Sequence, residues 1–481
     1  MSQKRLNGSR WHLVILPFAL SLTLILAYLA ALNPASGKIL SPGSPSPESV
    51  ITSSAVAEWS AILGLPPEIC RQLAAGTTSA PANVRKFPFP YRAMLAISSD
   101  LDECTPTAFL NYHRFLNTTA TTPFGPGLGL DVADSFWLYN GTDYSQDPVT
   151  SYCRGLDPTQ RQDADFIERY WQCGWIDSLH TFGNFSRRTP GDFVFTRALA
   201  EQGWAVLDQA QIYPKIWVDH GTETNVQNCG SYSLFTSSRY QRGDDPRSPF
   251  YHIDLTLAAG VKFFWHSRHS TAFGQAFPLS PIKFRDGRKA WTFDRYTGEP
   301  AGSGHNWTWV PSKLSSQLTA DHLQSLVDNQ HYSLVAQHLG QNSSDYENRT
   351  SGLYTEENLS ALRRLADYQY RGEILVARTS RLLTYAVSQK YVRYATASHL
   401  GHTYINIQAI DDPVFGSYVP PLDELRGLTF YCPDPAATTL LVSMTALAPS
   451  EITLNPPDES GRPSLSVRWF DPDTTDYSTE Y

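Results

Sequence analysis

The chain contains a series of short apolar runs, each of which ends in polar and potentially reactive residues. Runs this short and this uniformly apolar are typical of strands that are buried on both faces, as in parallel sheets. The runs are Met94–Ile97, Gly174–Ile176, Lys215–Val218, Val261–Trp265, Ser333–Gln337 and Glu373–Ala377. Because helical segments fit between several of them, we expect an α/β fold, a (β/α) barrel whose reactive residues gather at the carboxyl ends of the strands.

Two segments between these runs carry helix signals. The segment that begins at Thr355 has a capping sequence followed by leucines at helical spacing, and Gly372 ends it just before the next strand. Residues 192–202, followed by Gly203, make a similar unit. Both fit the alternation of strand and helix that a barrel requires.

The pattern changes from about residue 391 to β-branched runs broken by Pro and Gly. Such runs are typical of an antiparallel β-sandwich appended to the barrel. They are Thr403–Ile407, Leu428–Tyr431, Thr438–Val442 and Ser464–Phe470. The acidic tail from Asp471 to Tyr481 is expected to be disordered.

The first part of the chain differs from the rest. Trp11–Leu32 is a run of 22 residues without an acid, lysine or arginine, which is long enough to span a bilayer. Because basic residues precede it and only Lys38 follows soon after, we expect a single-pass, membrane-anchored protein whose C-terminal part is extracytoplasmic, in the periplasm or at the cell surface. Cleavage at the small residues near Ala30-Ala31 or Ala35–Gly37 would make the protein secreted instead.

The chain therefore divides into four parts: an anchor or signal segment (1–32), a Pro/Ser-rich tether with a short helical region (33–85), the barrel (86–390) and the sandwich with its tail (391–481). A net charge of −8 without a concentrated basic surface argues against nucleic acid as the main partner. The six cysteines have no CxxC spacing, which argues against a structural zinc cluster.

Asp100 and Asp102 follow the first apolar run and are two residues apart. In an extended segment such a pair leaves the same face of the strand, so the two carboxylates converge on one place. Carboxylates side by side repel each other unless a metal ion, a shared proton or an arginine lies near them. The structural alternative is that they cap a following helix, whose start Thr105-Pro106 resembles.

His180 and Asn184 follow the second run. They are four residues apart, so a helical turn would bring the imidazole and the amide oxygen to one ion. Other strand ends carry further candidates, namely Asp219, His220, His266 and His338. Five strand ends with a carboxylate or histidine favour an active site over five unrelated loop residues.

The ordered segments Ser99–Asp102, His180–Asn184 and the late His338 resemble the motifs of the polysaccharide deacetylase (NodB-homology) superfamily. The resemblance covers roughly residues 86–390 and implies a distorted (β/α) barrel. It implies that Asp100 is the catalytic base and His338 the general acid. It also implies that Asp102, His180 and Asn184 hold a divalent metal, with Zn expected and Co, Mn or Ni as alternatives.

The chain departs from the family pattern at three places. Leu101 separates the two acids, Asn184 stands where the family has a second histidine, and the late segment reads Val335-Ala336-Gln337-His338. An Asn keeps an oxygen donor, but it weakens a zinc site, which prefers imidazole nitrogen.

The resemblance implies a metal-dependent hydrolase that removes N-acetyl groups from a surface or exported polysaccharide, so the expected partner is an N-acetylated glycan. In such a reaction the metal polarises the acetamide carbonyl and its bound water, while a carboxylate and a histidine move the protons. Asp219, His220 and His266 are candidates for orienting the substrate, and Trp265 is a candidate for bounding the sugar site, although buried packing is its alternative role.

Two other functions stay open. A glycoside hydrolase with a barrel and a β-sandwich would also use paired carboxylates and aromatic subsites, but it needs neither histidine nor metal. A non-catalytic carbohydrate-binding relative of the deacetylases is the second alternative, which the replacement of a metal histidine by Asn184 keeps open. Release of acetate from an N-acetylated polymer, or shortening of its chains, distinguishes deacetylase from hydrolase.

Overall fold

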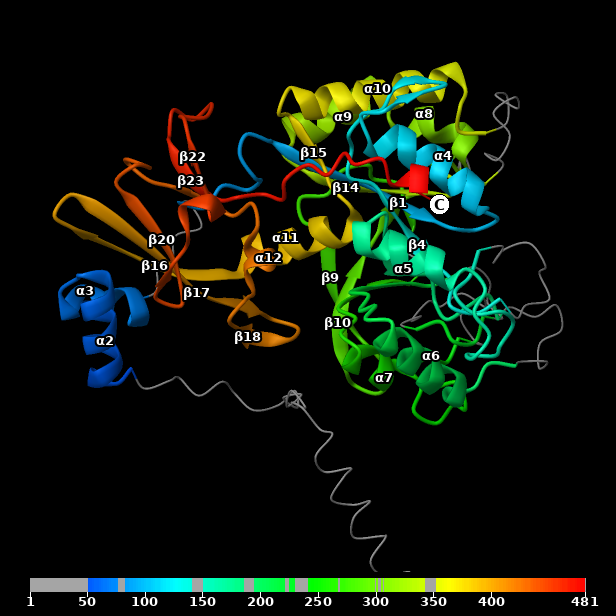
Figure 1. Cartoon of the computed structure of the whole chain (residues 1–481), viewed down its shortest axis with the longest axis horizontal. Helices are drawn as coiled ribbons and strands as arrows, with labels where there is room; N and C mark the ends of the chain where they lie inside the picture. The colour runs from blue at the N-terminus through cyan, green and yellow to red at the C-terminus, as the bar shows by residue number, and fades with distance from the viewer. Residues whose placement is uncertain are drawn as a thin grey trace, which may run out of the picture. The chain divides into compact units, whose positions relative to one another are not determined.

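The computed structural model describes residues 51–76, 83–140, 150–185, 194–220, 225–229, 241–266, 269–298, 300–301, 304–305, 307–341 and 352–480. All of these residues belong to one compact unit, Glu48–Tyr481. Figure 1 shows the elements of this unit coloured along the chain.

The expectation of a single-pass, membrane-anchored protein is corrected by the structure. Among the described residues, no helix combines the length and the apolar character that a membrane crossing requires. The expectation was drawn from the hydropathy of Trp11–Leu32, which lies outside the described residues.

Eleven strands in the described part of the chain form one sheet. Ten follow in the order β8-β11-β14-β1-β4-β5-β6-β7-β10-β9, and β15 pairs with the first residues of β1. Neighbouring strands are parallel except β9 and β10. The bounds are β1 (Ala93–Asp100), β4 (Ala133–Phe136), β5 (Ile176–Leu179), β6 (Ile216–Val218), β7 (Phe263–Trp265), β8 (His269–Ser270), β9 (Leu279–Lys283), β10 (Lys289–Phe293), β11 (Arg295–Tyr296), β14 (Tyr332–Gln337) and β15 (Ile374–Val376).

All six apolar runs of the sequence form strands of this sheet, namely β1, β5, β6, β7, β14 and β15. Every residue of these strands is buried, as expected for a parallel sheet covered on both faces. The helices between and after them are α4 (Pro106–Asn117), α5 (Ala164–Cys173), α6 (Arg197–Gln209), α7 (Ile253–Ala258), α8 (Leu314–Gln317), α9 (Ala320–Asp328), α10 (Glu356–Tyr370) and α11 (Thr379–Tyr391).

Each of the two predicted helices begins after a threonine whose hydroxyl group caps its first turn. α10 begins after Thr355, whose side chain accepts a hydrogen bond from the Asn358 N–H at 3.2 Å, and Gly372 with φ 73° follows its end. The helix expected over residues 192–202 starts later, because Thr196 provides the cap of α6. Residues 192 and 193 themselves lie outside the described residues.

The large sheet is curled. The guanidinium carbon of Arg295 on β11 lies 3.6 Å from the ring centroid of Trp265 on β7, although six strand steps separate these strands in the sheet order. In a flat sheet, six steps would put them about 29 Å apart. Over the described residues the edge strands β8 and β9 do not pair with each other, so the expected barrel is not confirmed as a closed one.

Two further sheets follow α11 in the chain. One contains β16 (Val392–His399), β17 (His402–Asp412), β18 (Gly416–Tyr418), β20 (Thr438–Val442) and β21 (Thr445–Ala446), and the other contains β19 (Thr429–Tyr431), β22 (Ile452–Asn455) and β23 (Ser464–Val467). The short helix α12 (Leu422–Leu425) lies between β18 and β19 in the sequence. Since β17 and β20 are parallel, an antiparallel β-sandwich is not confirmed in the expected form.

The short helical pair before the large sheet packs on these C-terminal strands. It consists of α2 (Ser53–Leu63) and α3 (Pro67–Ala75), which lie beside β16 and β17 in Figure 1. Leu73 shares a buried cluster with Ala397 and Leu441, and Gln72 donates a hydrogen bond to the Thr396 carbonyl oxygen at 3.0 Å. Residues far apart in the sequence therefore share one core.

The acidic tail is ordered up to residue 480, contrary to the expectation of disorder. The Tyr477 carbonyl oxygen accepts hydrogen bonds from Arg169 and Tyr170 on α5, and Asp476 pairs with Arg114 on α4 at 2.9 Å. The acidic composition of the tail predicted that it would stay in solvent without fixed contacts. Its backbone and the Asp476 carboxylate instead have specific partners on α5 and α4.

Candidate functional site

Residues at the carboxyl ends of β1, β5, β6, β7 and β14 line a cavity of about 510 Å³. Seven of the residues that the sequence placed at the site line it, namely Asp100, Asp102, His180, Asp219, His220, Trp265 and His338. The parallel arrangement brings them together because the carboxyl ends of such strands share one edge of the sheet.

Asp102, His180 and His220 bring three donor groups together. His180 Nε2 lies 3.3 Å from Asp102 Oδ1, and His220 Nδ1 lies 3.1 Å from His180 Nε2 and 3.7 Å from Asp102 Oδ2. In a tetrahedral zinc site with bonds of about 2.0–2.1 Å, neighbouring donor atoms are about 3.3 Å apart. The spacing of these donors therefore fits a cation of this size, and the three residues could hold a metal ion.

The orientation of His180 favours the same interpretation. Its Nδ1–H donates to the Val218 carbonyl oxygen at 3.1 Å, which leaves Nε2 as the ring nitrogen that faces Asp102 and His220. Asp102 Oδ1, 3.3 Å from this nitrogen, is buried and has no hydrogen-bond partner among the described residues. A cation between Nε2 and Oδ1 would be a partner for both atoms.

Asp102 is an ionised carboxylate. Burial by itself would raise the pKa of its carboxyl group, but the neighbouring imidazoles of His180, His220 and His338 outweigh burial and hold the pKa well below its ordinary value. An ionised, partly unsatisfied carboxylate between imidazoles is the donor set that a divalent transition metal prefers.

Asp100 is held by two other groups. Arg295 Nη1 lies 2.8 Å from Asp100 Oδ2, and the Ser135 hydroxyl donates to Oδ1 at 2.7 Å. Burial would raise the pKa of the Asp100 carboxyl group, but Arg295, His180 and His338 together hold it below its ordinary value. Asp100 is therefore an ionised proton acceptor whose orientation is fixed from both sides.

His338 lies between the two acids. Its Nε2 is 2.8 Å from Asp102 Oδ2 and 3.7 Å from Asp100 Oδ2. These three residues form a second group that could hold a metal ion. Because Arg295 already places a positive charge on Asp100 Oδ2, the group of Asp102, His180 and His220 is the better cation site.

Tryptophan rings pack against the imidazoles. The ring centroid of Trp137, which follows β4, lies 4.2 Å from that of His180 and 4.7 Å from that of His220. The ring of Trp309 meets the His338 ring edge-on with centroids 4.6 Å apart, and the backbone N–H of His338 donates to the Trp309 carbonyl oxygen at 3.1 Å. These contacts fix the planes of the rings on which metal binding and proton transfer depend.

Two residues that follow the donors have left-handed backbones. Glu103 follows Asp102 with φ 54°, and Thr181 follows His180 with φ 54°. A non-glycine residue in this conformation costs about 1–3 kcal/mol and persists where the surrounding structure fixes it. Five other described non-glycine residues, none of which lines the cavity, share this conformation, so it marks tight turns in general as well as these two strand ends.

The segment 225–229 holds the loop that contains Thr181. The Gln227 side chain accepts a hydrogen bond from the Phe182 N–H at 3.0 Å and donates to Thr181 Oγ1 at 3.3 Å and to the Gly183 carbonyl oxygen. Asn225 and Asn228 donate to the His220 carbonyl oxygen at 3.0 Å and 2.9 Å. One buried amide segment therefore links the backbones beside both candidate metal-binding histidines.

Asn184 and His266 do not line the cavity. The prediction that Asn184 reaches the metal required a helical turn after His180, and the left-handed Thr181 interrupts such a turn. His266 Nδ1 lies 2.8 Å from the Thr292 hydroxyl. Asp219 does line the cavity, but its Oδ1 accepts from the Trp217 indole N–H at 2.7 Å.

Sequence reasoning missed several residues of the site, among them Arg295, Ser135 and Trp137. Arg295 could have been noticed as an arginine between the aromatic residues Phe293 and Tyr296. Ser135 and Trp137 flank the end of β4, a strand that the apolar runs did not include. No local signal marks Ser135, because its role depends only on Asp100 in the neighbouring strand.

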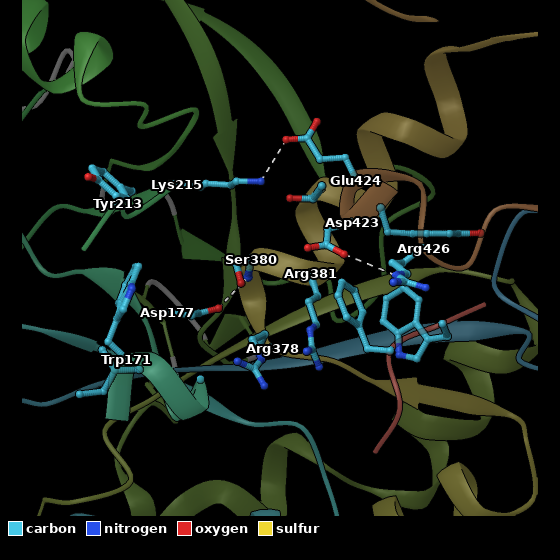
Figure 2. A pocket seen from close by; sticks show the side chains of 16 residues that line it. Trp171, Asp177, Tyr213, Lys215, Arg378, Ser380, Arg381, Asp423, Glu424 and Arg426 are labelled. Carbon is cyan, nitrogen blue, oxygen red and sulfur yellow. Dashed lines mark hydrogen bonds and ion pairs between the residues drawn. The ribbon is translucent and has the colours of Figure 1, made fainter. Parts of the chain in front are cut away.

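A second cavity of about 280 Å³ is lined by other residues (Figure 2). Its charged side chains are paired locally, since Lys215 contacts Glu424 at 3.0 Å and Asp423 contacts Arg426 at 3.5 Å. Asp177 accepts a hydrogen bond from the Ser380 N–H at 2.8 Å and thereby caps α11. These pairings indicate a structural role.

The comparisons with known proteins find no match: no family model fits the chain, and no curated protein and no solved structure is significantly similar to it. The function has to be inferred from the chemistry of the site.

Proposed function

We propose that this protein is a metal-dependent hydrolase that removes N-acetyl groups from a glycan. The observation that carries the proposal is the cluster of Asp102, His180 and His220. Two further groups lie beside this cluster: Asp100, which Arg295 keeps ionised, and His338. A cation site, a carboxylate base and a histidine acid within one cavity are the groups that amide hydrolysis requires.

The proposed metal is zinc, held by Asp102, His180 and His220. Two imidazoles and one carboxylate leave a fourth position for water or substrate, which is the arrangement of catalytic rather than structural zinc sites. Cobalt, manganese and nickel are alternatives with the same donors. A bound divalent ion would polarise the acetamide carbonyl and lower the pKa of water.

The protein's own groups would move the protons. Asp100 would accept the proton of the attacking water, since its carboxylate is ionised and oriented by Arg295 and Ser135. His338 would donate a proton to the departing sugar amine, because its Nε2 lies at the carboxylate pair. Trp309 would keep the His338 ring in the required plane.

A glycoside hydrolase is disfavoured by the charge state of the two acids. Such an enzyme keeps one carboxyl group protonated as the general acid, by raising its pKa. In the Asp100–Asp102 pair both pKa values are lowered. Asp219 also lines the cavity and burial raises its pKa well above the ordinary value, but its Oδ1 already accepts hydrogen bonds from the Trp217 indole N–H and the Cys229 backbone N–H. Asp102 is therefore better suited to hold a metal ion, and Asp100 to act as a base, than either is to serve as the general acid or nucleophile of a glycoside hydrolase.

The fold that goes with this function is a distorted (β/α) barrel of the polysaccharide deacetylase type with a C-terminal β-sandwich. The curled parallel sheet and the position of the site at the carboxyl ends of its strands support the barrel. The two small sheets after α11 support the sandwich.

The test is to purify the full chain, measure its zinc content, and assay acetate release and chain length with an N-acetylated polymer. We expect about one ion per chain, acetate without chain shortening, and loss of both ion and activity on dialysis against a chelator, with recovery when zinc is restored. Chain shortening without acetate would indicate a hydrolase of glycosidic bonds. A metal-free protein that binds the polymer and releases nothing would indicate a non-catalytic relative.

A further inference from the structure

The cavity at the candidate metal centre continues outward along a row of aromatic side chains. Trp265, which contacts Arg295, is only 6% exposed, whereas Trp307 is 43% exposed, and both line the cavity. His269 lies between them, with its ring centroid 5.2 Å from Trp265 and 4.8 Å from Trp307. The aromatic lining therefore leads from the buried carboxylate pair to the solvent.

Hydrogen bonds to backbone atoms hold the outer end of this row. The Thr308 N–H donates to the Thr297 carbonyl oxygen at 2.8 Å, and Lys313 donates to the Trp307 carbonyl oxygen at 3.0 Å. Gln337, the last residue of β14, donates to the Thr308 carbonyl oxygen at 3.0 Å. An exposed ring on a fixed backbone loses little freedom when it binds a ligand, which is what a preorganised contact requires.

The same cavity also presents planar polar groups. Glu103 follows the candidate metal ligand Asp102, and its carboxylate accepts a hydrogen bond from the Gln341 side chain at 3.0 Å. A pyranose ring has two apolar faces and hydroxyl groups at its edge, so it is recognised by an aromatic surface together with carboxylate and amide groups. A wholly apolar ligand would offer this carboxylate no donor besides Gln341.

We propose that Trp307 and His269 form a subsite that binds a second sugar unit of the substrate, next to the unit that reacts at the metal centre. This inference rests on the proposed function. A ligand that contacts both the buried acids and Trp307 must cross the cavity and emerge into solvent, as a glycan chain does. The substrate is then an oligosaccharide or polysaccharide, and a single N-acetylhexosamine makes only the inner contacts.

The experiment compares an N-acetylhexosamine with its β-1,4-linked tetramer, using the wild type, Trp307→Ala, Trp307→Phe and the control Tyr370→Ala. Tyr370 is 91% exposed on α10 and does not line the cavity. For Trp307→Ala we expect kcat/KM for the tetramer to fall about tenfold through KM, as for truncation of a single well-placed tryptophan contact. The monomer value should not change, Trp307→Phe should retain most of the tetramer activity, and Tyr370→Ala should behave as the wild type.

Equal effects of Trp307→Ala on the tetramer and the monomer, or no effect on either, would overturn the subsite. If none of the variants releases acetate, the proposed function fails, and calorimetric titration with the tetramer then decides the inference separately. Weaker binding to Trp307→Ala than to Tyr370→Ala would support the subsite, and equal binding would refute it.

Discussion

Arg295 Nη1 lies 2.8 Å from Asp100 Oδ2, while the same guanidinium packs on the ring of Trp265. The two residues of this ion pair are 195 positions apart in the sequence, and both are buried. Arg295 is the strongest of the charges that lower the pKa of Asp100 against the effect of burial, so this pair carries the proposed role of Asp100 as a base.

Replacing Arg295 by Met should move the acid limb of the pH–rate profile to higher pH. Arg295 lowers the pKa of Asp100, whereas burial raises it. Without Arg295 the pKa rises, so the base becomes protonated at a higher pH. We expect a roughly 100-fold loss of kcat near neutral pH, since a positioned base contributes about 10²–10⁴. Arg295→Lys keeps a positive charge, so its acid limb should lie closer to that of the wild type. If the acid limb of Arg295→Met does not move, Asp100 is not the base.

Replacing His220 by Ala should weaken zinc binding on the order of 100-fold or more, because removing a ligand costs at least as much as removing a supporting contact. Asn184→Ala is the matched comparison. Asn184 does not line the cavity, so this variant should retain the metal if it folds, which circular dichroism can verify. Competition with a chromophoric chelator measures both affinities. Loss of zinc in Asn184→Ala with retention in His220→Ala would restore Asn184 as the ligand.

Gln227→Ala should lower metal affinity about 10–100-fold without removing a donor atom. The buried Gln227 side chain holds Thr181 and Phe182, next to His180, so its loss should let the His180 loop relax. The visible spectrum of the cobalt-loaded protein reports the change in ligand geometry. The control is Asn455→Ala, which truncates a buried amide in the C-terminal strands. Each variant should lose about 1–3 kcal/mol of stability, but only Gln227→Ala should change the spectrum.

His252 should make the fold sensitive to mild acid. It is fully buried, its Nε2–H donates to the Gln227 carbonyl oxygen at 2.7 Å, and burial lowers its pKa from 6.5 to about 4. Because the unfolded chain takes up this proton at a higher pH than the folded chain, the stability is fully present above pH 6.5 and is lost as the pH falls through 4. The contribution is on the order of 3 kcal/mol.

The check is urea unfolding of the wild type and His252→Gln at pH 7 and pH 4.5. The variant can keep a donor to the Gln227 carbonyl oxygen but takes up no proton. Its loss of stability between the two pH values should therefore be smaller than that of the wild type. Parallel losses would show that other groups cause the acid sensitivity.

The main sheet could be predicted from the sequence because its signal is local. Short apolar runs that are buried on both faces have few alternatives to parallel strands, and all six became strands, five of which carry cavity-lining residues at their carboxyl ends. The C-terminal strands were found in the same way, but the pairing of β17 with β20 was not, since parallel and antiparallel strands have similar local patterns.

The candidate metal-binding histidines show where local reasoning stops. The spacing of His180 and Asn184 indicated a shared ion only if the chain turned as a helix, but Thr181 takes a left-handed conformation. His220 arrives instead from the end of β6, which pairs with β5. A ligand contributed by a neighbouring strand leaves no fixed spacing in the sequence.

Buried parallel strands that present acids and histidines at one edge of a sheet could be predicted from local patterns, because burial and strand direction leave a signal in short segments of the chain. Which of these groups meet depends on the three-dimensional arrangement of the strands. Strand order and the curl of the sheet bring His220 to Asp102 and Arg295 to Asp100, and interactions across such sequence distances depend on packing rather than on any short pattern.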